Sequence, residues 1–234
     1  MRNIKEVIIN GISLEKILEK HKKWLNKEEG GEKADLSYAD LSNADLGYVD
    51  LTDADLSCAD LSDTDLTDAN LKGVDLRHAN LRGADLSYAD LTNTNLRGAD
   101  LRDVNLRHAI LRFANLNNIE YDENTSFFAL QCPEEGSFIG YKKANNKIVK
   151  LLITEDAKRS SATSRKCRCN KAKVLSITNI NNTEEYDKVI SGYDNNFIYK
   201  VGELIEVEDF DEDRWNECSA GIHFFVTRYE AVNY

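Results

Sequence analysis

Four residues near the C-terminal end carry thiol or imidazole groups that could hold a metal ion, namely Cys167, Cys169, Cys218 and His223. Together with Cys132 they could form a tetrahedral zinc site, because thiolate and imidazole are ligands that zinc prefers. Their spacing differs from that of a typical zinc knuckle, in which two residues separate paired cysteines. In a strand Cys167 and Cys169 would share one face, as core residues do, and buried free thiols are common. We therefore expect no metal and no other cofactor, with zinc as the alternative.

The same residues could pair a nucleophile with a base, as Cys218 or Cys167 with His223. Such a pair needs a third group that orients the base, and the sequence identifies none. His223 alternates with Phe225 in the segment GIHFF, so both would lie on one side of a strand and His223 would be packed. We therefore assign no catalytic residue and expect a protein that is not an enzyme. An enzyme activity in the C-terminal domain is the alternative.

A dense group of basic residues could bind phosphate. Residues 142–173 contain eleven basic and two acidic residues, and serine and threonine lie among the basic ones. Basic side chains beside hydroxyls could hold a phosphate group or a nucleic-acid backbone. The candidates are Lys158, Arg159, Arg165, Lys166 and Arg168. Residues 174–234 contain thirteen acidic and four basic residues, so pairing within the domain or with acidic coils is the interpretation we favour. No aromatic residues are placed for stacking on bases, so direct nucleic-acid binding is not expected.

A second basic group is spaced at multiples of five residues and could bind a partner. It comprises Lys72, Arg77, Arg82, Arg97, Arg102, Arg107 and Arg112. Residues 34–71 contain ten Asp and no Lys or Arg, whereas residues 72–118 contain five Asp and seven basic residues. Neighbouring Asp could neutralise the arginines, which favours a solvated, self-screened surface. The alternative is a rod, acidic toward one end and arginine-striped toward the other, that docks a partner or a second copy.

A five-residue repeat positions these arginines from Ala34 to Asn118. Leu occupies position 36 and every fifth position through Leu116, seventeen times in all. A small residue lies two positions before each Leu, and Asp or Asn lies directly before it except at Ile110. Leucines five apart would spread around a helix and would alternate faces on a flat strand. Only a chain that turns a corner once per unit buries them all, which predicts a solenoid with one narrow core. Its core residues include Leu36, Leu41, Leu46, Leu56, Leu76, Leu96 and Leu116.

Units such as ADLSY, ADLRD, ANLRG and ANLNN resemble the pentapeptide-repeat family, whose pattern is A(D/N)LXX. The resemblance implies a mostly β fold, a right-handed quadrilateral β-helix with four units per coil, so that Arg77 stacks with Arg97 and Arg82 with Arg102. The later segments CPEEGSFIGYKKA, LLITEDAKRSSATSRKCRCNKAKV and ECSAGIHFFVTRYEA resemble an uncharacterised domain that follows such repeats in bacterial and phage proteins. That resemblance implies a domain boundary and a bacterial or phage origin, and it transfers no activity.

Three regions follow from these patterns: an N-terminal strand and helix cap at 1–33, the β-helix at 34–121, and a C-terminal α+β domain at 122–234. Ser13 is a suitable N-cap for an amphipathic helix that would cover the open solenoid end, with Trp24 over the first coil. In the C-terminal domain, strands are expected at 137–143, 147–153, 174–180, 203–208 and 222–227, and short helical pieces near 155–159 and 228–232.

Composition limits the classes of protein further. The 234 residues carry a formal net charge of −11, and no apolar run is long enough to span a membrane. The five cysteines and the absence of signal-peptide features indicate reduced thiols and a cytoplasmic protein. We expect a scaffold or protein–protein interaction protein that forms a homo-oligomer. The alternative is a DNA-mimic inhibitor of a DNA-handling enzyme such as gyrase, which a resemblance to quinolone-resistance pentapeptide proteins implies. The short repeat and its Arg-rich later coils count against that alternative.

Overall fold

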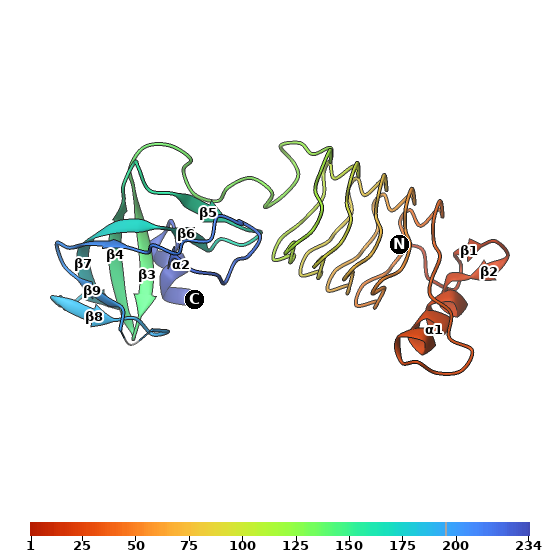
Figure 1. Cartoon of the computed structure of the whole chain (residues 1–234), viewed down its shortest axis with the longest axis horizontal. Helices are drawn as coiled ribbons and strands as arrows, with labels where there is room; N and C mark the ends of the chain where they lie inside the picture. The colour runs from red at the N-terminus through yellow and green to blue at the C-terminus, as the bar shows by residue number, and fades with distance from the viewer. Residues whose placement is uncertain (195) are drawn as a thin grey trace. The chain divides into compact units, whose positions relative to one another are not determined.

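The chain divides into two compact units, Met1–Ala129 and Leu130–Tyr234 (Figure 1). The computed structural model describes residues 1–194 and 196–234. This boundary lies a few residues after the one expected between residues 121 and 122, because parallel bridges of the solenoid continue to Glu120 and Ser126. Residues 1–33 belong to the first unit.

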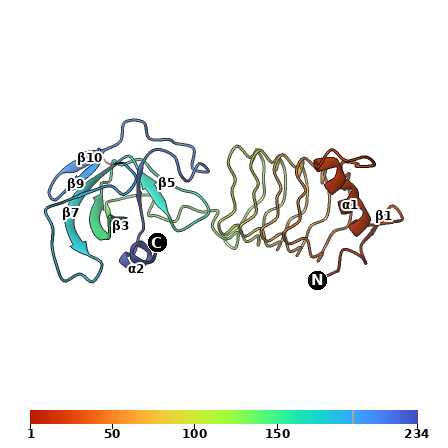
Figure 2. The same cartoon turned by 90° about the horizontal axis from the view of Figure 1, so that it is seen from below.

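The first unit is a β-solenoid whose backbone pairing repeats every twenty residues. Parallel bridges join Asp35 to Asp55, Asp55 to Asp75 and Asp75 to Asn95, so each coil contains four five-residue units (Figure 2). The amide of Leu36 donates to the Asp55 carbonyl at 2.7 Å, and the Asp55 amide donates to the Ala34 carbonyl at 3.1 Å. Adjacent coils therefore satisfy each other's backbone polar groups, as strands of a sheet do.

The leucines of the repeat form the core of this unit. Those at positions 36, 41, 46, 56, 76 and 96 are at most 1% exposed. Leu116 differs, because it is only half-buried. Its unit lies in the last coil, and within the described residues no bridge joins Asn115 to a later coil. The end of the solenoid therefore leaves its last Leu without a full set of neighbours.

The second residue after each Leu has a restricted backbone. From Tyr38 to Asn118 every such residue has a left-handed φ, between 55° and 72°. These positions contain Tyr, Asn, Asp, Cys, Gly, His and Phe, and never a β-branched residue or proline. Left-handed φ is costly for β-branched side chains and inaccessible to proline. The repeat therefore has a third constrained position besides the small residue and the Leu.

The N-terminal segment contacts the first coil. β1 (Ile8–Ile9) and β2 (Ile12–Ser13) form a hairpin that leads into α1 (Leu14–Leu25). Before the hairpin, Arg2 forms a parallel bridge with Ala44 and thereby extends the coil pairing. His21 of α1 is fully buried, and its Nδ1 accepts a hydrogen bond from the Ala34 amide at 3.1 Å.

Two details of this segment differ from the sequence prediction. Ser13 occupies the N-cap position, yet its side chain makes no capping hydrogen bond. Trp24 is only half-buried and stacks on His21 at a ring-centroid distance of 5.5 Å. His21, rather than Trp24, is therefore the fully buried ring of the helix.

The second unit is built on antiparallel sheets. A four-stranded sheet has the order β10 (Leu204–Glu206), β7 (Lys171–Asn179), β4 (Lys147–Ile153) and β3 (Phe138–Ala144). A three-stranded sheet has the order β11 (Ile222–Phe224), β6 (Cys167–Cys169) and β5 (Arg159–Ser161). β8 (Lys188–Ile190) pairs with β9 (Ile198–Lys200), and α2 (Arg228–Asn233) ends the unit. A bridge between Tyr141 and Phe225 connects β3 with the end of β11.

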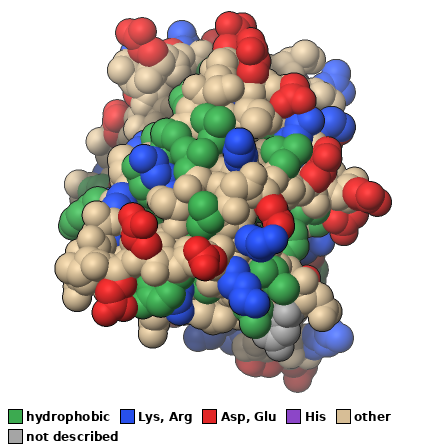
Figure 3. Space-filling view, turned by 90° about the vertical axis from the view of Figure 1, so that its left-hand side faces the viewer, with side chains coloured by type: hydrophobic (Ala, Val, Ile, Leu, Met, Phe, Trp, Pro, Cys, Tyr) green, Lys and Arg blue, Asp and Glu red, His purple; other side chains and the backbone are tan. Residues whose placement is uncertain are grey.

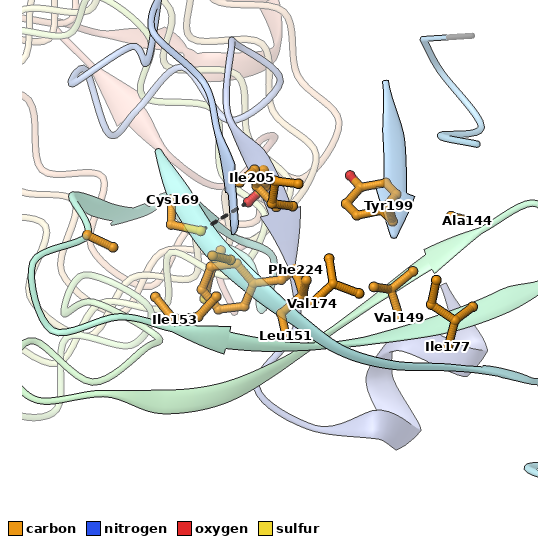
Figure 4. Packing of buried hydrophobic residues seen from close by; sticks show 14 of the residues in the cluster. Ala144, Val149, Leu151, Ile153, Cys169, Val174, Ile177, Tyr199, Ile205 and Phe224 are labelled. Atoms are coloured by element: carbon orange, nitrogen blue, oxygen red, sulfur yellow. Dashed lines mark hydrogen bonds between the residues drawn. The ribbon is translucent and has the colours of Figure 1, made fainter. Parts of the chain in front are cut away.

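Figure 4 shows the core of this unit, where Leu151, Val174 and Phe224 lie together. Gly140 makes this packing possible, because a Cβ at that position would lie 2.7 Å from the Phe224 ring. The space-filling view of Figure 3 shows basic, acidic and hydrophobic side chains interspersed on the face of this unit that is turned to the viewer.

Most expected elements of the second unit are present, and one is absent. The five predicted strands correspond to β3, β4, β7, β10 and β11, and the predicted helix near 228–232 corresponds to α2. The helix predicted near 155–159 is wrong, because a turn occupies residues 155–156 and Arg159 begins β5. Within the described residues, no helix is both long and apolar enough to cross a membrane.

Candidate functional site

The outer face of the solenoid carries the arginines that the repeat pattern singled out. The bridge between Asp75 and Asn95 places Arg77 and Arg97 at equivalent positions of adjacent coils, and the bridge between Asn80 and Asp100 does the same for Arg82 and Arg102. The predicted stacking is therefore present in the backbone pairing. It arranges the outer side chains in columns, each made of residues twenty positions apart.

Four basic residues of these columns pair with neighbouring Asp. Arg77 contacts Asp75 at 2.6 Å and Arg102 contacts Asp100 at 2.5 Å, in each case within one unit. The side-chain hydrogen bond of each arginine holds the pKa of its Asp partner below the usual value. Lys72 and Arg82 instead reach Asp90 and Asp103 of the next coil, at 3.0 and 3.1 Å. Exposed pairs of this kind contribute little to stability but they do screen charge.

The other three arginines lack a carboxylate partner. Arg112 lies over the ring of Phe113, with 4.6 Å between its guanidinium carbon and the ring centroid. The side chains of Arg97 and Arg107 make no hydrogen bond or ion pair with any described residue. Self-screening therefore leaves three positive side chains without a carboxylate at this end of the repeat, and two of them, Arg97 and Arg107, also lack any hydrogen-bond partner among the described residues.

The Asp residues of the early coils serve the local backbone. In the first units Asp35 Oδ1 accepts from the Ser37 amide at 3.1 Å, and Asp40 Oδ1 accepts from the Ser42 amide at 3.0 Å. The serine hydroxyls donate to the same carboxylates and keep the pKa of Asp35 and Asp40 below the usual value. Such bonds favour Asp and Asn in turns. The carboxylates therefore hold the unit corners and still present negative charge outward.

The phosphate-binding candidates of the second unit form hydrogen bonds and ion pairs with other residues of the same unit. Arg159 donates to the carbonyls of Pro133, Gly136 and Thr154. Arg168, which is 1% exposed, donates to the carbonyls of Asp211, Asp213 and Ala220. Lys158 pairs with Glu212, Arg165 with Glu230 at 2.7 Å, and Lys166 with Glu217 at 3.7 Å. Because each candidate has its own partners, the five residues do not form one phosphate site.

The cysteines and His223 do not assemble into a metal or nucleophile site. Cys167 and Cys169 face the core beside Cys132, and burial raises the pKa of Cys169 to about 12. His223 lies opposite Arg168 in the pairing of β11 with β6, so it points away from the face that carries Cys167 and Cys169. Cys218 is exposed. Among the residues that the structure describes, no three His, Cys, Asp or Glu side chains are grouped to hold a metal ion.

The second unit contains a cavity of about 1010 Å³ that sequence reasoning missed. It lies beside the end of β3 and is lined by Lys142, Lys166, Tyr199 and His223, among others. Lys142 is 8% exposed and shares its face of β3 with Gly140 and Ala144, both buried. The sequence did contain one sign of this cavity. Side chains alternate between the two faces of the strand FIGYKKA, which places Lys142 on the face that is turned to the core.

Comparison with known families matches both units. A pentapeptide-repeat model of eight copies matches residues 34–73, 64–103 and 84–119. The chain belongs to the pentapeptide-repeat family. Residues 128–231 match a family of unknown function, DUF5758, which covers almost all of the second unit. No curated protein matches the chain.

Several solved pentapeptide-repeat structures are similar to part of the chain. Rfr23 from the cyanobacterium Cyanothece 51142 is 42% identical over 39% of this chain and 59% of its own, with a TM-score of 0.30. A pentapeptide-repeat protein from Nostoc PCC 7120 is 39% identical over 47% of this chain and 81% of its own, with a TM-score of 0.28. QnrB1, a plasmid-mediated fluoroquinolone resistance protein, is 18% identical over 39% of this chain and 79% of its own, with a TM-score of 0.18. The match to Rfr23 thus spans less than two thirds of that protein.

Proposed function

We propose that the solenoid is a right-handed, four-sided β-helix whose first coil is capped by α1. The twenty-residue spacing of the bridges supports four sides, one for each five-residue unit. The buried contact between His21 and the Ala34 amide supports the capping role. An open solenoid end exposes backbone and apolar core, and a terminal cap removes both liabilities.

We propose that the chain is a non-enzymatic interaction scaffold that associates with further copies of itself. The observation that carries this proposal is the incomplete charge pairing along the solenoid. Arg97 and Arg107 lack partners among the described residues, whereas residues 34–71 contain ten Asp and no basic residue. Two copies could therefore place the unpaired arginines of one solenoid against the acidic coils of another. Complementary charge of this kind guides association and selects the partner surface.

Static light scattering over a range of protein concentrations tests this proposal. We expect a dimer or larger species at low salt, and a shift toward monomer as salt screens the charges. The double substitution Arg97→Glu and Arg107→Glu should shift the equilibrium to monomer. The control variant, Lys173→Glu with Lys188→Glu, makes the same charge change on the second unit. It should leave the equilibrium between monomer and oligomer unchanged. A monomeric wild type at high concentration and low salt would refute self-association.

A DNA mimic is a second candidate, favoured by the acidic columns of the early coils. The bridges align Asp35 with Asp55 and Asp45 with Asp65, so carboxylates repeat at the spacing of paired strands, about 4.8 Å. Duplex DNA carries one charge per about 1.7 Å, so several columns together are needed to approach its charge density. A gyrase supercoiling assay tests this candidate. Inhibition that is lost when Asp45 and Asp65 are changed to Asn would support it, and no effect at micromolar protein would rule it out.

A further inference from the structure

The cavity of the second unit has the size and lining of a ligand site. Its volume of about 1010 Å³ lies near the upper end of the range for small-molecule pockets. Strands β3, β9, β10 and β11 and the segments around them contribute to its wall. Strand β11 meets β3 at the Tyr141–Phe225 bridge, and the cavity lies beside the following residues of β3. All of its lining residues belong to this one unit.

Lys142 is the residue of this cavity that most needs a partner. It is 8% exposed, and its β4 neighbour in register is the fully buried Val149. The Lys142 ammonium makes no hydrogen bond or ion pair with any residue that the structure describes. The stem of the side chain is buried, whereas the ammonium is not among the fully enclosed polar atoms and opens to the cavity, where an anion could compensate its charge.

The side chains around Lys142 do not supply that anion. The Lys166 side chain is 11% exposed, and its ammonium already has Glu217 as a partner at 3.7 Å. His223 Nε2 lies 3.1 Å from the Glu217 carbonyl, which can only accept, so this nitrogen carries the proton. Burial, together with Lys142 and Lys166, lowers the pKa of His223 to about 4, which keeps the ring neutral near neutral pH. Lys142 is therefore a positive group of the cavity wall that has no carboxylate partner among the described residues.

The rest of the lining fits an organic body attached to an anionic group. Phe197, Tyr199 and Phe225 give the cavity aromatic walls. Four carboxylates also line the cavity, and all of them are exposed, namely Asp194, Glu206, Glu208 and Asp209. Solvent screens exposed charges strongly, whereas the buried Lys142 acts in a medium of lower polarity.

We propose that this cavity binds a small organic anion, with a phosphate or carboxylate group on Lys142 and an apolar or aromatic body against Phe197, Tyr199 and Phe225. Lys166 adds positive charge next to the same group. The neutral His223 offers Nδ1 as a hydrogen-bond acceptor and thereby favours a ligand that carries a hydroxyl or amine near the anion. This site is separate from the solenoid surface, so it does not depend on the scaffold proposal.

Calorimetric titration of the full chain with phenyl phosphate and with benzoate tests the site and distinguishes the two anionic groups. At least one of them should bind saturably, whereas benzyl alcohol, which has the ring without the charge, should not bind. Lys142→Met keeps the length of the side chain and removes the charge, so it should weaken binding about tenfold or more. Lys173→Met, at an exposed side chain of β7, is the matched control and should bind as the wild type does. Saturable binding to Lys142→Met with wild-type affinity would overturn the proposal, as would the absence of binding of either anion to the wild type at millimolar concentration.

A second measurement uses the wild type alone. Burial lowers the pKa of Lys142 to about 8, and a bound anion should raise it again. Titrations near that pH in buffers of different ionisation enthalpy should therefore show proton uptake on binding. Binding without proton uptake would show that the anion does not contact Lys142 and would overturn the assignment.

Discussion

At the scale of single residues, Lys142 is the side chain whose position is hardest to explain by folding alone. It lies on the core face of β3, between the buried Gly140 and Ala144, where an apolar residue would cost nothing. Its pKa responds to Lys166 and to the Cys169 thiol, and His223 lines the same cavity; none of the three is an anion when Cys169 keeps its proton. A residue placed in this way lowers the stability of the folded state, which a ligand can offset.

The pH dependence of stability should reveal this cost. The pKa of Lys142 is about 8 in the folded protein, because of burial and then of Lys166, and about 10.4 in an unfolded chain. Between these values the unfolded state binds the extra proton, so the free energy of unfolding contributed by Lys142 rises with pH. The Lys142 contribution is lost as pH falls through about 8.

Chemical denaturation of wild type and Lys142→Met from neutral pH to about pH 10 checks this expectation. The variant should be more stable at neutral pH by about 2–3 kcal/mol, and the difference should shrink as the pH rises. Lys173→Met controls for the loss of an exposed lysine and should track the wild type. A variant that is less stable than the wild type at neutral pH would contradict the expected cost.

Arg168 shows why single residues of the second unit were hard to predict. The sequence places it in a basic segment, and a phosphate-binding role follows from its neighbours in the chain. In the structure its guanidinium donates to three carbonyls of residues 211–220, more than forty positions away. Contacts between such distant segments leave no local pattern. The same reason explains why the cavity beside Lys142 was missed, although its lysine at an inward strand position was visible.

At the scale of elements, the core of the solenoid could be predicted almost completely, because every five-residue unit repeats the same pattern of a small residue and a Leu two positions later. The short strands β5, β6, β8 and β9 have three residues each and were not predicted as strands. Three residues show little alternation, and the equally short β10 and β11 were found only as parts of the longer predicted segments 203–208 and 222–227. The left-handed corner of each unit was also missed, because the many residue types found there concealed what they share.

The solenoid core gives a direct test at this scale. Leu76 is 1% exposed in a middle coil, whereas Leu116 is half-buried in the last one. Leu76→Ala should lower the free energy of unfolding by about 2–5 kcal/mol, because neighbouring coils hold the cavity open. Leu116→Ala removes the same atoms and should cost clearly less, because part of its surface is already in water. Urea denaturation of both variants measures the difference. Equal losses would show that the last coil is packed as tightly as the middle ones.

At the scale of the whole molecule, the two units differ in how far their charged side chains are paired with one another. In the second unit, basic residues of 158–168 pair with acidic residues or carbonyls of the same unit, as the division of charge along the sequence indicated. In the first unit, residues 34–71 contain ten Asp and no basic residue, and Arg2 pairs with Asp40 from outside that range. Much of the net charge of −11 is therefore concentrated on one part of the surface, which is where association should respond most strongly to salt.

The twenty-residue coil also determines which changes of length this protein can accept without scrambling its surface. Removal of four consecutive units would shorten the solenoid by one coil and keep every outer residue in its own column. Removal of a single unit between Arg77 and Arg97 would move Arg97 from the position that follows Arg77 to the one that follows Lys72. The buried leucines would be unaffected, since every unit supplies the same core. A change in the number of units can therefore alter which outer residues lie in the same column, while the leucine core stays the same.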